Sequence, residues 1–129
     1  MTAEDIIGEG LTALDVSTDG DYFRIGFKDS KGHPGSLTLP SECLNAFLMT
    51  LPRMVNLALQ ARHQDPSLRL VYQLGKFRTE RSSDPKTVIL TLATPDGFEV
   101  SFGLKEDHMK GISDGFERYF AGAEIPKSH

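Results

Sequence analysis

The stretch that decides the fold is FRIGFKDSKGHPGSLTLPSECLNAFLMTL, residues 23–51. From Phe23 onward, hydrophobic residues alternate with polar residues or glycine, which is the period of a strand with one buried face. Lys31–Gly35 supplies loop residues, and Ser36–Leu39 predicts a second short strand. After Pro40, hydrophobic residues at spacings of three and four predict a helix. The stretch therefore predicts strand, turn, strand and helix in succession.

The predicted helix has two notable positions, its start and its proline. Pro40 or Ser41 opens it, because proline tolerates the first helical position and serine is a capping residue. Pro52 removes a backbone hydrogen bond, so we expect a kink or a break into two helices near Thr50. The hydrophobic stripe of the helix should pack on the apolar face of the strands. Its members are Leu44, Phe47, Leu48, Leu51, Val55 and Ala58.

Much of this stretch recurs 65 positions later with no gap. The alignment matches two turns, two strands and one helix start with corresponding hydrophobic positions. Convergent ββα patterning is the alternative explanation. Between Gly10/Gly75 and Val55/Phe120, seven of 46 aligned pairs are identical, namely Gly10, Ser17, Asp19, Gly32, Ser36, Leu39 and Arg53 with their counterparts.

The second half repeats the order of elements. Leu68–Leu74 alternates and predicts a strand, with a bulge or a bend at Gly75 before Lys76–Arg81. Val88–Leu92 and Phe98–Leu104 flank a strong turn signal and predict a hairpin. Each half thus contributes strands followed by a helix.

We therefore predict an α+β fold of two βββα repeats, within a single domain covering residues 1–129. The repeats comprise approximately residues 10–64 and 68–122, are related by pseudo-two-fold symmetry, and each has an antiparallel sheet covered by a helix. Thr12–Val16 supplies the first strand, and Met109–Phe120 supplies the last helix.

The composition is that of a globular protein, with 39% hydrophobic and 25% charged residues among 129. No hydrophobic run has the length needed to cross a bilayer. An acidic start and the single Cys43 predict a cytoplasmic location without disulfides. The net charge of −4 disfavours non-specific binding of nucleic acid.

A locally basic segment with an aromatic residue is the main candidate site. Basic and aromatic side chains together suit single-stranded nucleic acid, through phosphate contacts and base stacking. The alternative is a solvated outer face, or an edge strand protected by charge. We call this set the basic strip; its members are Arg69, Lys76, Phe77, Arg78, Arg81 and Lys86.

One family resemblance follows from the strand and helix segments. Leu14–Val16, Phe23–Ile25, Gly35–Pro40 and Ser41–Leu48 resemble the repeat of PUR-type single-stranded nucleic-acid-binding proteins, over roughly two thirds of the chain. The resemblance implies sheet-plus-helix repeats that pair within or between chains. It also implies an exposed sheet that binds nucleic acid through basic and aromatic residues.

Metal and thiol chemistry receive little support. His33, His63, His108 and His129 show no metal-ligand spacing with Cys43 or with one another, which favours exposed histidines over a metal site. A cysteine near a helix start can be a reactive thiolate, but a small buried residue is the preferred interpretation of Cys43. We expect no cofactor, no metal and no catalytic residues.

The leading functional hypothesis is a non-catalytic binding module that meets a protein partner or itself through the polar sheet face or a sheet edge. Gly111 and Gly115 lie one turn apart in a predicted helix, which suits close approach of another helix or tolerance on an exposed face. Single-stranded nucleic-acid binding on the basic strip is the alternative. An enzyme would need a pocket collecting Cys43, a histidine and a carboxylate.

Overall fold

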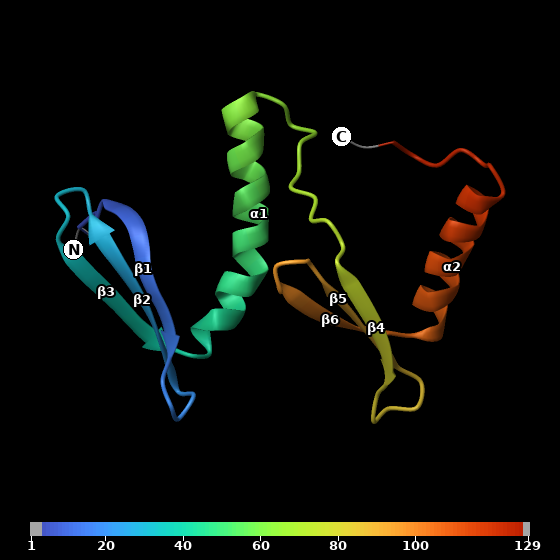
Figure 1. The fold of residues 1–129 in the computed structure, drawn as a ribbon, viewed down its shortest axis with the longest axis horizontal. Coiled ribbons are helices and arrows are strands. Elements are labelled where there is room, and N and C mark those ends of the chain that lie inside the picture. The colour runs from blue at the N-terminus through green and yellow to red at the C-terminus, as the bar shows by residue number, and fades with distance from the viewer. Residues whose placement is uncertain (1–3, 128–129) are drawn as a thin grey trace. The chain divides into compact units, whose positions relative to one another are not determined.

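The computed structural model describes residues 4–127, which form six strands and two helices in the order βββαβββα (Figure 1). Two compact units, Met1–Ala58 (unit 1) and Leu59–His129 (unit 2), divide the chain. Each unit contains one three-stranded antiparallel sheet. The prediction of an α+β fold with two βββα repeats is therefore confirmed.

The sheet of unit 1 consists of β1 (Gly8–Val16), β2 (Tyr22–Asp29) and β3 (Pro34–Pro40), in that order. β1 begins earlier than predicted because Gly8 pairs with Asp29 across two register shifts. Side chains alternate along paired strands, so one face of this sheet is hydrophobic. We call it the apolar face of unit 1; it comprises Leu11, Leu14, Val16, Phe23, Ile25, Phe27, Leu37 and Leu39.

Helix α1 (Cys43–His63) begins later than predicted, three positions after Pro40. The reason is that Ser41 bonds to the β1–β2 turn. Its hydroxyl donates to the Gly20 carbonyl oxygen at 2.6 Å, and its backbone N–H donates to the Asp21 carbonyl oxygen at 2.8 Å. Pro52 lies inside one continuous helix, so the predicted break into two helices near Thr50 is wrong, while the alternative of a kink stays a prediction. A proline removes only its own N–H donor, and the hydrogen bonds of neighbouring turns keep the helix intact.

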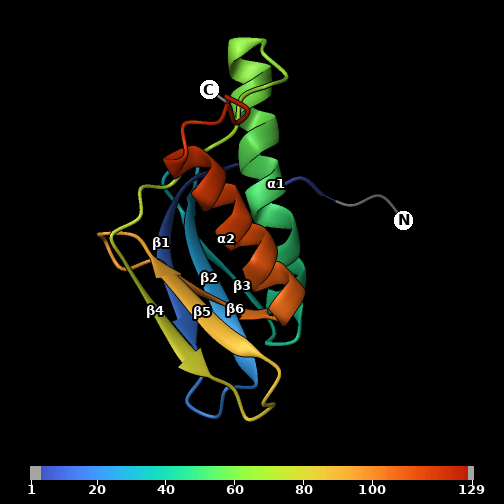
Figure 2. The same cartoon turned by 90° about the vertical axis from the view of Figure 1, so that its right-hand side faces the viewer.

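The sheet of unit 2 consists of β4 (Lys76–Arg81), β5 (Val88–Ala93) and β6 (Glu99–Leu104), with β5 in the centre (Figure 2). Its register places a second, mostly hydrophobic set of side chains on one side, with Thr79 and Arg81 as its polar members. We call this side the apolar face of unit 2; it comprises Phe77, Thr79, Arg81, Val88, Leu90, Leu92, Val100, Phe102 and Leu104.

The predicted strand Leu68–Leu74 is wrong, since these residues have irregular structure. The ladder between β4 and β5 ends where Lys76 pairs with Ala93, followed by one more bond from the Gly75 N–H to the Ala93 carbonyl oxygen at 2.7 Å. Beyond Ala93 the chain turns through Pro95, which has no N–H to donate. Leu68–Leu74 therefore does not extend the ladder between β4 and β5.

Neither helix packs along the sheet of its own unit, in contrast to the cover expected from the sequence. Helix α2 (Glu106–Phe120) follows β6 after one connecting residue, Lys105. Within residues 4–127, the buried side chains are Phe23, Thr91 and Ala93, and none belongs to a helix. Hydrophobic faces of sheets and helices thus remain exposed inside each unit.

Candidate interaction surface

The basic strip does not lie on one surface. Because side chains alternate along β4, Lys76 and Arg78 project from one face of the sheet, while Phe77 and Arg81 project from the other. The remaining members lie outside the strands, Arg69 before the sheet and Lys86 in the β4–β5 turn. A single nucleic-acid strand lying on one face would therefore meet only part of the strip.

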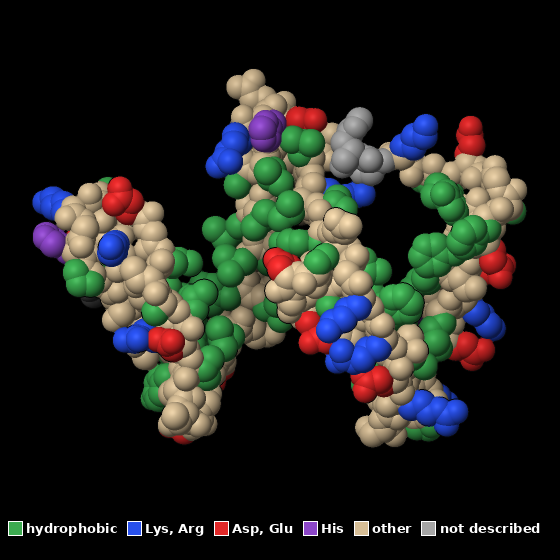
Figure 3. Space-filling model, in the orientation of Figure 1, with side chains coloured by type: hydrophobic (Ala, Val, Ile, Leu, Met, Phe, Trp, Pro, Cys, Tyr) green, Lys and Arg blue, Asp and Glu red, His purple; other side chains and the backbone are tan. Residues whose placement is uncertain are grey.

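Arg78, the central cation of the basic strip, is already paired. Its Nε lies 3.0 Å from Glu80 Oε1, and its Nη1 lies 2.6 Å from Glu99 Oε1. Hydrogen bonds first to Glu80 and then to Glu99 raise the pKa of the Arg78 guanidinium above its ordinary value. Acidic and basic side chains lie next to one another on this surface (Figure 3). A phosphate would have to displace two carboxylates to bind here.

The polar faces of both sheets satisfy their own polar groups. In unit 2, the Thr91 side chain is only 1% exposed, and its hydroxyl lies 2.7 Å from the hydroxyl of Ser101. In unit 1, Arg24 Nη2 lies 2.7 Å from Asp15 Oδ2. Because these polar side chains already pair within their own sheet, they gain less from contact with a binding partner.

The apolar face of unit 2 contains a groove of about 320 Å³. No charged side chain lines the groove. One of its lining side chains, Phe102, is 51% exposed. Tyr72, from the irregular segment before β4, stacks against Phe98 with ring centroids 5.6 Å apart. We call this feature the apolar groove; its main lining residues are Tyr72, Leu74, Leu92, Phe98, Val100 and Phe102.

Helix α2 presents an exposed hydrophobic stripe, which lines a hollow together with Ile125 and Pro126 of the segment that follows the helix. Phe116 is 61% exposed, and Ile112 and Tyr119 are also exposed. Figure 3 shows hydrophobic side chains at the surface along this helix. A Cβ added to Gly111 or Gly115 would meet no atom within 4 Å. The stripe and its glycines therefore form an open surface.

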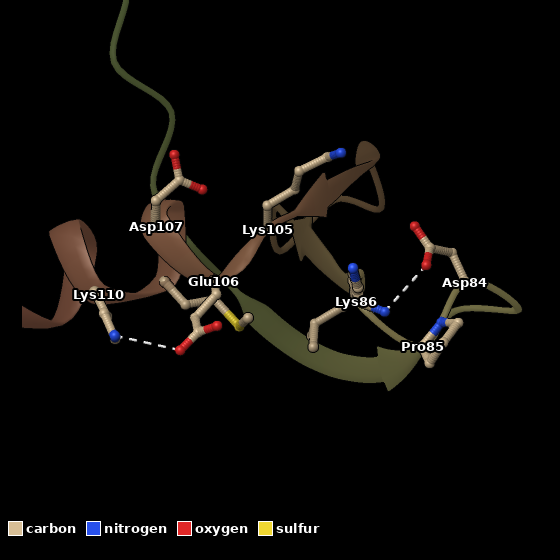
Figure 4. A pocket seen from close by; sticks show the side chains of 9 residues that line it. Asp84, Pro85, Lys86, Lys105, Glu106, Asp107 and Lys110 are labelled. Carbon is tan, nitrogen blue, oxygen red and sulfur yellow. Dashed lines mark hydrogen bonds and ion pairs between the residues drawn. The ribbon is translucent and has the colours of Figure 1, made fainter.

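A mixed-charge hollow of about 790 Å³ lies between the β4–β5 turn and the start of α2 (Figure 4). Lys110 Nζ pairs with Glu106 Oε1 at 3.2 Å. The Lys86 backbone N–H donates to Asp84 Oδ1 at 3.1 Å. Three acidic and three basic residues line the hollow, so it has no net preference for an anion or a cation: Asp84, Glu106, Asp107, Lys86, Lys105 and Lys110.

Among residues 4–127, no three histidine, cysteine or acidic side chains come close enough to hold a metal ion. Cys43 is partly buried. The His108 Nδ1 accepts a hydrogen bond from the Lys105 backbone N–H at 3.1 Å, and His129 lies outside the described residues. No helix in the described part of the chain is both long and hydrophobic enough to span a bilayer. The cytoplasmic location stays a prediction.

No protein-family model matches the chain, and comparison with curated proteins and with solved structures also gave no match. The two βββα units are established by the structure. The resemblance to PUR-type repeats stays a prediction.

Sequence reasoning missed the apolar groove and the short connection between β6 and α2. It assigned the hydrophobic side chains of each sheet to an internal core covered by the unit's own helix. One signal was present in the sequence: the strand alternation ends at Leu104, and the acidic first turn of the helix begins at Glu106. A connection of one residue gives a helix little freedom to fold back.

Proposed function

We propose that the chain is a non-catalytic protein-interaction module that associates with a second copy of itself through its apolar faces. The observation that carries this proposal is that most of the hydrophobic face of each sheet is left uncovered by the helix that follows it, apart from the contact between Phe23 and Phe47 in unit 1. The apolar faces replace the polar faces as the expected contact surface, because the polar side chains already pair with one another.

The exposed hydrophobic side chains support an extensive association. On the apolar face of unit 1, Leu11 and Leu14 are each 68% exposed, and on the apolar face of unit 2, Phe77 is 69% exposed. Full burial of one such side chain contributes about 1.5–3 kcal/mol. Covering several of them at once therefore favours a hydrophobic interface.

A second copy is favoured over an unrelated protein because each unit offers both halves of the required contact. One half is a hydrophobic sheet face and the other is a hydrophobic helix stripe. A two-fold symmetric dimer uses such a pair twice, since each copy supplies both surfaces. The chain therefore carries surfaces that complement its own.

Nucleic-acid binding is the alternative, and a PUR-type identity would favour it. The division of the basic strip and the paired Arg78 do not support this alternative. Fluorescence anisotropy with labelled single strands at low salt tests it. Binding that weakens with added salt and with the double substitution Arg78→Ala, Arg81→Ala would favour nucleic-acid binding over self-association.

Sedimentation equilibrium across a range of protein concentrations tests the proposed function. We expect a mass twice that of the chain. Leu14 is 68% exposed on the apolar face of unit 1, and Leu14→Asp should raise the dimer Kd at least about tenfold. The control Ser36→Asp places the same carboxylate on the polar face of that sheet and should leave the Kd unchanged. A monomeric mass at every concentration would contradict the proposal.

A further inference from the structure

We infer that two copies complete each other by exchanging α2, so that the helix of one copy occupies the apolar groove of the other. This inference rests on the proposed function and names the elements that make the contact. Both elements belong to unit 2, which carries the groove on its sheet and the exposed stripe on its helix. Each copy gives one helix and receives one.

The connection between β6 and α2 directs the helix away from its own sheet. Lys105 is the single connecting residue, and its backbone is extended, with φ −91° and ψ 170°. Its N–H donates to His108 Nδ1 at 3.1 Å, and its carbonyl oxygen accepts the N–H of Met109 at 3.1 Å. Both bonds hold this connection in place. Short connections of this kind favour exchange between chains, because the element cannot reach its own partner surface.

The helix fits the sheet in length. Helix α2 has 15 residues and is about 22 Å long. Strands β5 and β6 have six residues each and are about 20 Å long. One helix of this length therefore covers the hydrophobic face of the sheet from end to end.

The contacting surfaces also fit in chemistry. No charged side chain lines the apolar groove, and the stripe on α2 is hydrophobic. Gly111 and Gly115 leave open space beside the stripe, so the helix backbone can approach large side chains such as Phe98 and Phe102. Each glycine destabilises the helix by about 1 kcal/mol relative to alanine. The close approach of the helix backbone to the groove explains why glycine stands at both positions.

Lengthening the connection provides the first test. Insertion of Gly-Ser-Gly-Ser between Lys105 and Glu106 should let α2 fold onto the sheet of its own copy and raise the dimer Kd, measured by sedimentation equilibrium, at least about tenfold. The control is the same insertion between Ser30 and Lys31, in the β2–β3 turn of unit 1, which should leave the Kd unchanged. If neither insertion changes the Kd, the connection does not enforce exchange and the inference fails.

Cysteine pairing provides the second test and reports the contact itself. In a Cys43→Ser background, a Phe102→Cys copy and a Phe116→Cys copy of different tagged mass are refolded together and oxidised. Exchange predicts a disulfide between the two different copies. Asp114→Cys in place of Phe116→Cys should not form it, because Asp114 lies on the opposite face of α2.

The outcomes separate this inference from the proposed function. A dimer without the Phe102–Phe116 cross-link would overturn the exchange of α2 and leave self-association standing. A monomer in which only the double variant, with both cysteines in one chain, forms the bridge would overturn both, because each helix then covers its own sheet. A cross-link between different copies, lost in the Asp114→Cys control, would establish the exchange.

Discussion

The two units share a pattern but differ in how the helix leaves the sheet. In unit 1, Ser41 bonds to the β1–β2 turn, and Phe47 meets Phe23 edge to face with ring centroids 5.6 Å apart. In unit 2, Lys105 alone separates strand from helix. The comparison shows that hydrophobic patterning determines which elements form, whereas the connection determines which surface the helix can reach.

The two units also bury different groups. Unit 1 buries Phe23 on its apolar face, where the first turns of α1 reach it. Unit 2 buries Thr91 and Ala93 on its polar face. Thr91 lies between Arg78 and Ser101 of the neighbouring strands, and Ala93 lies between Lys76 and Glu99. Internal packing of unit 1 therefore depends on a helix contact, while that of unit 2 depends on a polar cross-strand pair.

Removing the helix contact of unit 1 should have the largest effect on stability. Phe23 is 6% exposed, and Phe23→Ala deletes a buried ring together with its contact to Phe47. We expect the free energy of unfolding to fall by about 3 kcal/mol. Urea titration followed by circular dichroism, at one fixed protein concentration, measures it.

The matched control for this change is Tyr22→Ala, which removes an exposed aromatic ring from the adjacent position of the same strand. It should cost much less, because no cavity forms. Equal losses for the two variants would mean that the contact between Phe23 and Phe47 does not distinguish unit 1 from unit 2.

The sequence predicted most of the fold because strand and helix periods are local signals. Phe23, Ile25 and Phe27 lie on one face of β2 as expected, and the +65 repeat correctly predicted a second sheet and helix. Leu68–Leu74 alternates equally well but forms no strand, because the ladder between β4 and β5 ends at Ala93. Alternation does not show where a ladder ends.

The basic strip was harder to predict than the fold. Its members are close in sequence, but adjacent residues of a strand point to opposite faces. The partners of Arg78 lie at different sequence distances, Glu80 in the same strand and Glu99 on β6. Charge pairing across a sheet depends on register, which the sequence did not provide.

The glycines of the β-hairpin turns test whether the two units remain equivalent where the repeat is identical. Gly32 and Gly97 have φ values of 81° and 99°, and an added Cβ meets nothing within 4 Å at either position. Gly32→Ala and Gly97→Ala should each cost about 1–2 kcal/mol, from backbone strain alone. Urea titration measures both. Replacement by Asn, which tolerates this conformation better, should cost less; a large difference between the two turns would break the equivalence.

The Thr91–Ser101 pair tests the polar interior of unit 2. Thr91→Val keeps the side-chain shape but removes the hydroxyl that lies 2.7 Å from Ser101 Oγ. We expect a loss of about 1 kcal/mol in the free energy of unfolding. The double variant Thr91→Val, Ser101→Ala should recover part of it, because no hydroxyl is then left unpaired. A double variant that loses the sum of both single effects would contradict this pairing.

The smallest effect is expected at two aspartates that the repeat places in corresponding turns. The hydroxyl of Ser17 and then the backbone N–H of Asp21 hold the pKa of Asp19 below its ordinary value. In unit 2, the backbone N–H of Lys86 and then Thr87 do the same for the pKa of Asp84. A lowered folded-state pKa contributes stability above the ordinary value of 3.8, and this contribution is lost as the pH falls through the folded-state pKa.

Asp19→Asn and Asp84→Asn should therefore each lower the Tm slightly at neutral pH and no longer do so at about pH 2. Thermal melts at both pH values measure this, and a Tm difference that persists unchanged in acid would show that the turns use these side chains for something other than their charge.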